Sequence, residues 1–149
     1  MKLTRVLTIV FAISMLQACG GNQEKPEVVK GDNGQKIQKA DSFTNIEAKD
    51  LNEVLKSETG DVVLLDVRTP GEIAGGKIAA DAVEFDFYEE DFQSNLESLD
   101  KNKKIYVYCK AGGRSSSAAK MLIDKGFKEV YNLNGGITAW QGSGFELSK

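Results

Sequence analysis

The sequence predicts an α/β protein with a central parallel β-sheet that is flanked by helices on both faces. Short apolar runs, such as residues 62–65 and 105–108, alternate with stretches that have helical spacing. A continuous apolar run is typical of a strand buried on both faces, and strands that alternate with helices usually form parallel sheets. In such sheets the ligand crevice lies beyond the carboxyl ends of the strands. We therefore expect the functional residues directly after the predicted strands.

Capping residues and apolar spacing predict the first elements. Residues 43–56 have apolar side chains at helical spacing, and Thr44 or Asn45 can cap a helix there. Residues 62–65 are a continuous apolar run and predict the first strand. Pro70 then breaks the strand and favours a short helical turn.

The middle of the chain predicts a second strand and an amphipathic helix. Residues 82–85 are expected to form the strand, and residues 91–99 place apolar side chains on one helical face. The aromatic residues Phe87, Tyr88 and Phe92 can either line a pocket or pack in the core, and we expect the core.

The last third of the chain predicts two strands and two helices. Residues 105–108 are the third strand, and the helix that follows Cys109 ends at Gly126, a typical C-terminal cap. Residues 129–133 are the fourth strand. An Asn-Gly-Gly turn comes next, and residues 137–140 begin a last short helix.

Composition limits the chemistry that the chain can perform. The 149 residues carry a net charge of −3 and include no histidine. Without histidine, one chain cannot form a Cys–His pair, a Ser–His triad or a His-ligated metal site. The two cysteines are too few for a structural zinc site or a disulfide framework. Because the chain has no block of basic residues, we expect no nucleic-acid partner.

The N-terminal region resembles the export segment of a bacterial lipoprotein. Residues 1–18 begin with basic residues and continue with an apolar run about half as long as the ~20 residues that span a bilayer, as in a cleaved signal peptide. The sequence Leu-Gln-Ala-Cys-Gly resembles a lipobox, which implies cleavage before Cys19 and lipidation of Cys19. Residues 19–40 lack an apolar period and are expected to be a flexible tether.

On this interpretation, residues 41–149 form the folded domain. The domain would be exported, anchored to a membrane through the lipid on Cys19, and located in the periplasm. The alternative is an ordinary secretory signal with an incidental cysteine.

Cys109 lies where the third predicted strand ends, a glycine-containing loop turns and a helix begins. The first amides of a helix lack internal partners, and glycines let loop amides turn toward one point, so this position favours an anion. A thiol held there is stabilised as a thiolate, and Arg114 can add a positive charge. A lone cysteine at a strand end is otherwise a small buried hydrophobe, but the Gly-Gly-Arg that follows favours an activated nucleophile.

Four segments, taken together, resemble the rhodanese family. The resemblance covers about residues 43–145, and Lys77 stands where many family members have histidine. Each signature alone is weak, but four in the right order and spacing are specific. The segments are residues 64–68 with Glu72, residues 76–78, residues 106–109 with Gly112 and Arg114, and residues 133–137 with Trp140.

The resemblance implies that Cys109 is a nucleophile that accepts a sulfane sulfur and becomes a persulfide. The protein would then be a sulfurtransferase that moves sulfur from an anionic donor such as thiosulfate to a thiol or cyanide acceptor. The amides of the loop would hold the persulfide and the departing anion, and Arg114 would maintain the shape and charge of the loop. The loop residues are Lys110, Ala111, Gly112, Gly113 and Arg114.

The resemblance also assigns supporting roles. Asp66 would be mainly a structural anchor near the pocket. Arg68 would pair with Glu72 or a neighbouring carboxylate, and the alternative is that it contacts substrate. Lys110 either attracts an anionic donor or is simply solvated, and the sequence leaves both open.

The spacing Cys-x4-Arg resembles sulfurtransferases, because the related phosphatases and arsenate reductases have one more residue in this loop. The reaction implied by the resemblance requires no metal or organic cofactor. Its partners would be a small sulfur-donor anion and a thiol acceptor, which could be a protein. The alternative function is a non-catalytic module of the same fold that binds a partner or senses sulfide or redox state.

Overall fold

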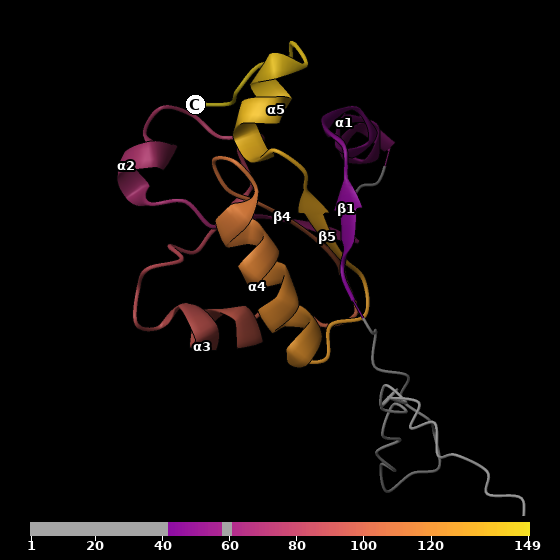
Figure 1. Cartoon of the computed structure of the whole chain (residues 1–149), viewed down its shortest axis with the longest axis vertical. Coiled ribbons are helices and arrows are strands. Elements are labelled where there is room, and N and C mark those ends of the chain that lie inside the picture. Colours follow the sequence, from indigo (N-terminus) through magenta and orange to yellow (C-terminus); the bar gives the residue numbers. More distant parts are fainter. Residues whose placement is uncertain (1–41, 58–60) are drawn as a thin grey trace, which may run out of the picture. The chain divides into compact units, whose positions relative to one another are not determined.

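The structure is a computed structural model that describes residues 42–57 and 61–149 (Figure 1). The expected signal peptide, the lipidated Cys19 and the tether lie outside the described residues and stay predictions. No helix in the described part is both long enough and apolar enough to cross a membrane. The described strands are β1 (Thr44–Ile46), β2 (Val62–Asp66), β3 (Val83–Glu84), β4 (Lys104–Tyr108) and β5 (Val130–Leu133). The described helices are α1 (Ala48–Ser57), α2 (Pro70–Ile73), α3 (Phe92–Glu97), α4 (Gly113–Asp124) and α5 (Gly136–Gly142).

The strands form a parallel sheet in the order β1-β5-β4-β2-β3. The register pairs Asp66 at the end of β2 with Tyr108 at the end of β4. The strands β2, β4 and β5 are neighbours and run in one direction, so the residues that follow them emerge at the same edge of the sheet. The expected α/β fold with a parallel sheet is confirmed.

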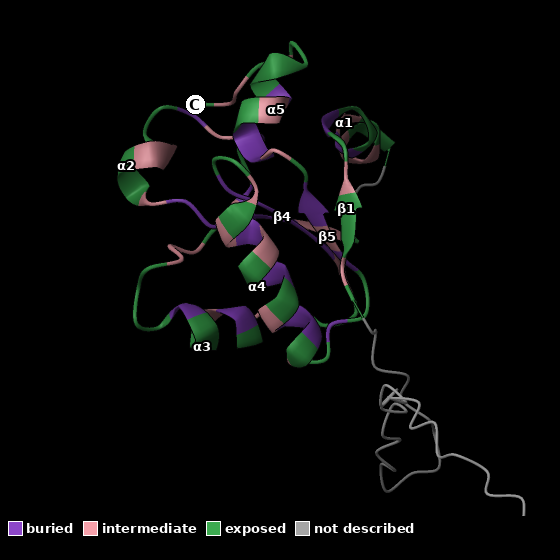
Figure 2. Ribbon diagram, in the orientation of Figure 1, coloured by how far each residue is buried: buried purple, intermediate pink, exposed green. Residues whose placement is uncertain are grey.

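Side chains alternate between two hydrophobic clusters, one on each face of the sheet. On β4, Ile105 and Val107 belong to the cluster packed with α3 and α4, whereas Tyr106 and Tyr108 belong to the cluster packed with α1 and α5. Figure 2 shows the buried positions on the strands and on the inward sides of these helices. Both faces are therefore covered, which explains why β2 and β4 are continuous apolar runs in the sequence.

The predicted helix over residues 43–56 is wrong at its start. Residues Thr44–Ile46 form the edge strand β1, which pairs with β5 from Thr44 opposite Tyr131 to Ile46 opposite Leu133. The helix α1 begins only at Ala48. The edge of β5 that does not face β4 supplies backbone hydrogen-bond partners to this segment. Because these partners lie far away in the chain, a local helical pattern does not reveal the pairing, which overrides the helical preference.

Candidate active site

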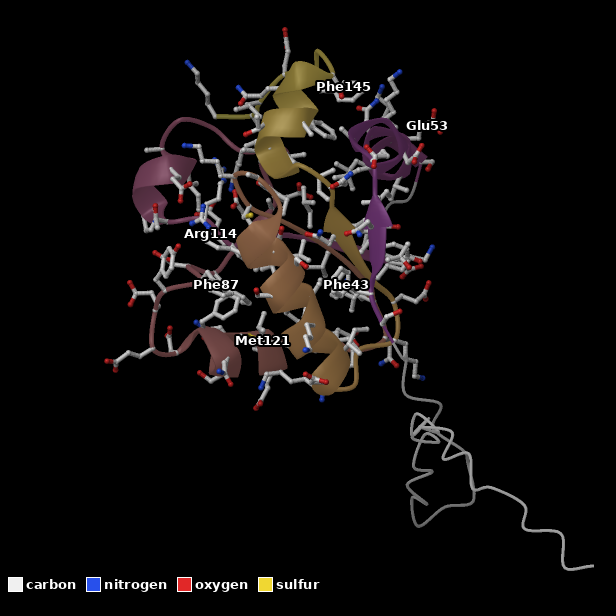
Figure 3. The ribbon with its side chains drawn as sticks, in the orientation of Figure 1. Phe43, Glu53, Phe87, Arg114, Met121 and Phe145 are labelled. Carbon is white, nitrogen blue, oxygen red and sulfur yellow. The ribbon has the colours of Figure 1, made fainter. Side chains whose placement is uncertain are left out.

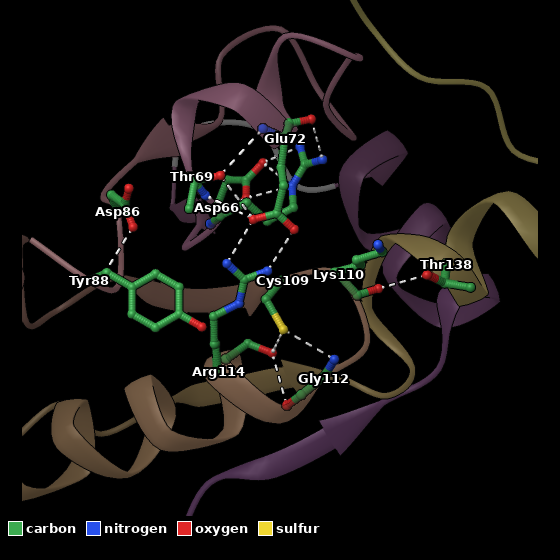
Figure 4. A network of polar contacts seen from close by, with 12 residues as sticks. Asp66, Thr69, Glu72, Asp86, Tyr88, Cys109, Lys110, Gly112, Arg114 and Thr138 are labelled. Atoms are coloured by element: carbon green, nitrogen blue, oxygen red, sulfur yellow. Dashed lines mark hydrogen bonds and ion pairs between the residues drawn. The ribbon is translucent and has the colours of Figure 1, made fainter.

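Cys109 lies directly after β4 and is 2% exposed. Its Sγ accepts a hydrogen bond from the backbone amide of Gly112 at 3.1 Å (Figure 4). The Ser115 hydroxyl lies 3.5 Å from the same sulfur. The loop and the first turn of α4 therefore direct donors at one buried sulfur, as expected for a site that favours a thiolate.

The turn at Gly112 requires glycine, because its φ of 96° is in the left-handed region that other residues rarely adopt. The start of α5 holds the other side of the loop. The amide of Ile137 donates to the Cys109 carbonyl at 2.9 Å, and both the amide and the hydroxyl of Thr138 donate to the Lys110 carbonyl. A Cβ on Gly136 would lie 2.4 Å from the Cys109 carbonyl oxygen, so only glycine allows this close approach.

Two opposing effects set the pKa of the Cys109 thiol. Burial raises this pKa, because removal from water disfavours the charged form. Hydrogen bonds from the Ser115 side chain and from the amides of Ser115, Ala111 and Gly112 lower it, and they outweigh burial. The net result is a pKa below the usual value for cysteine, which increases the fraction of nucleophilic thiolate.

Arg114 forms a two-point ion pair with Glu72 of α2. Its Nη1 lies 2.8 Å from Oε2 and its Nη2 lies 2.7 Å from Oε1 of Glu72. Figure 3 shows the Arg114 side chain extending from α4 toward α2. Glu72 is held in place by a capping box, in which Thr69 and Glu72 exchange hydrogen bonds at the start of α2. The expected role of Arg114 in maintaining the loop thus has a structural basis, an ion pair that joins α4 to the loop after β2.

The pKa of Glu72 reflects this pairing. The hydrogen bond from Arg114 lowers it to about 2, with smaller contributions from Thr69 and from the charge of Arg114, against an opposing effect of burial. The pKa of Arg114 is raised, chiefly by its hydrogen bond to Glu72. Both groups are charged at neutral pH, so Arg114 is already neutralised within the protein.

Arg68 forms the expected ion pair with a carboxylate, and of the two predicted partners the structure shows the neighbouring Asp66 rather than Glu72. Arg68 Nη2 lies 2.6 Å from Asp66 Oδ2, and Nε donates to both carboxylate oxygens. The remaining guanidinium donors bind the carbonyls of Glu72 and Gly76. Asp66 is fully buried and Arg68 is 4% exposed. The Glu72 carboxylate is unavailable to Arg68 because Arg114 occupies it, and the pair of Arg68 with Asp66 anchors the loop after β2.

The prediction that Tyr88 lies in the core is wrong. Phe92 is buried and Phe87 packs against the core, but Tyr88 is 70% exposed. The guanidinium of Arg114 lies over its ring, 5.6 Å from the centroid. The sequence pattern does not separate Tyr88 from Phe87, because they are adjacent aromatic residues that differ only in how far the fold buries them.

Sequence reasoning missed Ser115 as part of the site. Three consecutive serines open the helix after the loop, and of these Ser115 is the fully buried one. The position of Ser115 in the first helical turn after Cys109 was the signal that could have identified it. Whether its side chain points inward, however, depends on the residue at which α4 begins. The sequence placed that start near Ser115, whereas α4 begins at Gly113.

The remaining loop residues, Lys110, Ala111 and Gly113, are exposed on the solvent side of the site. Within residues 42–57 and 61–149, no group of three or more Cys, Asp or Glu side chains is arranged to hold a metal ion. The donors around Cys109 can stabilise a sulfur anion there.

Residues 47–143 match a family that is described as the rhodanese-like domain. A sulfurtransferase from Allochromatium vinosum is 35% identical over 102 residues, which cover 68% of this chain and 92% of that protein. The thiosulfate sulfurtransferase GlpE of Coxiella burnetii is 38% identical over 43% of this chain and 71% of its own length.

A tRNA uridine(34) hydroxylase from Synechocystis is 30% identical over 81% of this chain. The matched region spans only 48% of that relative, so its activity belongs to a longer protein. Among solved structures, a rhodanese-related protein from Thermoplasma volcanium aligns with a TM-score of 0.62 and 29% identity. The alignment covers 71% of this chain and 98% of that structure.

Proposed function

The chain belongs to the rhodanese-like domain family, and on that premise we propose that it is a sulfurtransferase that carries sulfur as a persulfide on Cys109. The observation that carries the proposal is the set of donors directed at one buried sulfur. Stabilisation of negative charge on that sulfur is what each half of a sulfur-transfer cycle requires.

In the first half-reaction, the Cys109 thiolate attacks the outer sulfur of thiosulfate. The bond between the two donor sulfurs breaks, sulfite leaves with the electron pair, and a persulfide remains on Cys109. In the second half-reaction, a thiolate or cyanide attacks the outer sulfur of the persulfide. Cys109 then leaves as a thiolate, which the amides and the Ser115 hydroxyl again stabilise.

Lys110 is the cation that we assign to donor attraction. The charge of Arg114 is matched by Glu72, and the charge of Arg68 is matched by Asp66. Lys110 is exposed beside Cys109 and pairs with no carboxylate in the described part of the chain. Of these three cations, Lys110 therefore keeps the charge that draws an anionic donor to the loop.

The length of the loop supports sulfur transfer over phosphate chemistry. Four residues separate Cys109 from Arg114, and α4 begins within them at Gly113. The loop closes around a single sulfur, with the Gly112 amide only 3.1 Å away. A tetrahedral oxyanion would need a wider ring of amides.

The test is direct detection of the persulfide. The full-length chain is reduced, incubated with thiosulfate and weighed intact by mass spectrometry, with Cys109→Ser beside it. We expect the wild type to gain one sulfur atom and Cys109→Ser to gain none, although Cys19 is still present in that variant. If the folded wild type with a free Cys109 thiol gains no sulfur from thiosulfate or from polysulfide, the chain is a binding or sensing module.

A further inference from the structure

A pocket of about 300 Å³ lies beside the catalytic loop. Lys110 lines one side, Gly76 lines another, and α5 contributes Ile137 and Gln141. Leu147, from the segment after α5, completes the wall. The volume equals that of roughly ten water molecules at ~30 Å³ each, so the pocket fits a compact organic molecule of amino-acid size.

Backbone pairing fixes the wall that contains Leu147. Lys77 and Ser148 exchange backbone hydrogen bonds of 2.8 and 2.7 Å, and Trp140 Nε1 donates to the Glu146 carbonyl at 3.0 Å. The pocket is therefore formed before a ligand arrives, which lowers the entropy cost of binding.

The charges around the pocket leave one cation unmatched. Arg68 and Glu72 both line it, but Asp66 neutralises the first and Arg114 neutralises the second. Within the described part of the chain, Lys110 pairs with no acid. Among the same residues, the side-chain amide of Gln141 forms no hydrogen bond. The pocket thus offers one positive charge, one amide and an apolar floor made by Ile137 and Leu147.

We infer that this pocket holds the sulfur acceptor, and that the acceptor is a small organic thiol with a carboxylate. The inference rests on the proposed function and names the substrate of its second half-reaction. Lys110 pairs with the carboxylate, Gln141 hydrogen-bonds it or a neighbouring polar group, and the carbon chain contacts the apolar floor. Thiosulfate is a compact inorganic dianion and has no use for an apolar floor or an amide.

The position of the pocket suits the chemistry. Cys109 does not line it, but Lys110 is the next residue, and consecutive Cα atoms are ~3.8 Å apart. The persulfide also extends the reactive atom about 2 Å beyond Sγ. The acceptor thiolate attacks that outer sulfur and a new S–S bond forms on the acceptor. The old S–S bond breaks, its electron pair leaves on Cys109, and no external oxidant or reductant is consumed.

Three small thiols of equal spacing between sulfur and polar group test the inference. They are 3-mercaptopropionate, which is anionic, 2-mercaptoethanol, which is neutral, and cysteamine, which is cationic. The full-length chain is loaded with sulfur, freed of donor, and mixed with each thiol while the persulfide is followed by mass spectrometry. The measured quantity is the ratio of discharge rates for the anionic and cationic thiols. Comparing this ratio between variants cancels the different intrinsic reactivities of the thiols.

The variants add a charge at Gln141. This residue is exposed and is not one of the hydrogen-bond donors around the Cys109 sulfur. We expect Gln141→Glu to lower the ratio about threefold or more and Gln141→Lys to raise it similarly, because one charge is added beside the bound carboxylate. The matched control is Gln93→Glu, an exposed glutamine on α3, which should leave the ratio unchanged. We also expect the discharge rate to saturate with 3-mercaptopropionate and to stay linear with cysteamine.

The outcomes separate the two proposals. If the wild type never gains sulfur, the proposed function fails, and the acceptor site fails with it. If the wild type gains sulfur but neither Gln141→Glu nor Gln141→Lys changes the ratio of discharge rates, the assignment of the pocket to the acceptor is overturned. The proposed sulfurtransferase activity is then unaffected. If Gln93→Glu changes the ratio as much as Gln141→Glu, the effect is long-range attraction and the pocket is again overturned.

Discussion

The loops that follow β2 and β4 leave the same edge of the sheet but use their polar groups in opposite ways. After β2, the guanidinium of Arg68 is saturated by the Asp66 carboxylate and by two carbonyls. After β4, the amide of Gly112 and the hydroxyl of Ser115 converge on the sulfur of Cys109. The first loop satisfies its charges internally, whereas the second directs donors at the sulfur that reacts in the proposed cycle.

The fold thus separates the groups that stabilise a loop from the groups that surround the cysteine sulfur. A buried ion pair with all its hydrogen bonds rigidifies a loop but is unavailable to substrate. Backbone donors around a sulfur stabilise whatever negative charge develops there. The ion pair between Arg114 and Glu72 joins the two loops, so the fixed loop positions the reactive one.

Breaking the fixed loop should give the largest effect. Asp66→Ala leaves the guanidinium of Arg68 buried without its counter-charge, and loss of one partner of a buried pair costs about 3–5 kcal/mol. We expect a decrease of that size in the free energy of unfolding, measured by urea denaturation.

The matched control is Glu97→Ala, which removes the partner of Lys125 from a surface ion pair in which Glu97 is 61% exposed. That variant should leave the free energy of unfolding close to the wild-type value, because solvent screens an exposed ion pair. Similar losses for Asp66→Ala and Glu97→Ala would contradict the role of Asp66 as a buried anchor.

Weakening the reactive loop should alter chemistry more than stability. Ser115→Ala removes a hydrogen bond to the Cys109 sulfur and so raises the pKa of the thiol. A hydrogen bond to a charged group contributes about 1.5 kcal/mol or somewhat less at a long distance, so alkylation by iodoacetamide at pH 7 should slow about threefold to tenfold. The pH dependence of alkylation measures this change.

Two observations make Ser115→Ala a clean test. The Gly112 carbonyl, which the Ser115 hydroxyl also contacts, still accepts the Ser116 amide at 3.0 Å. The control is Ser117→Ala, whose exposed hydroxyl contacts only the Gly113 carbonyl among the described residues and which should alkylate at the wild-type rate. Equal alkylation profiles for wild type and Ser115→Ala would remove Ser115 from the site.

Breaking the link between the loops should have the smallest effect. The pKa of Glu72 is about 2 in the folded protein, below its usual value of 4.5, so its stabilisation is present above pH 4.5 and is lost as the pH falls toward 2. Because the Glu72 and Arg114 side chains are 29% and 17% exposed, solvent screens the pair, and we expect about 1 kcal/mol.

The measurement is the free energy of unfolding of wild type and Glu72→Gln from pH 7 to pH 2.5. The difference between them should shrink as the pH falls below 4.5, the usual pKa of Glu72. The control is Glu89→Gln, an exposed carboxylate without an ion pair in the described part of the chain. A difference that does not change with pH would mean that Glu72 acts only through its capping box.

The sequence alone determined the fold class and the place of the buried cysteine at the end of β4. The apolar runs of β2 and β4 predict buried parallel strands, because only a sheet covered on both faces tolerates such continuous hydrophobicity. The glycines after Cys109 predict a turn into a helix start, because backbone conformation at those positions is a local property. These features depend on residues close together in the chain.

The side-chain pairings depend on how the chain packs in three dimensions. Glu72 receives Arg114, which is 42 residues away in the chain, and this leaves Arg68 to Asp66. The strand β1 exists because β5 offers it an edge, Ser115 faces the sulfur because α4 begins at Gly113, and Tyr88 is exposed because its loop points it outward. Each of these outcomes depends on how elements distant in the chain pack, which local spacing does not encode.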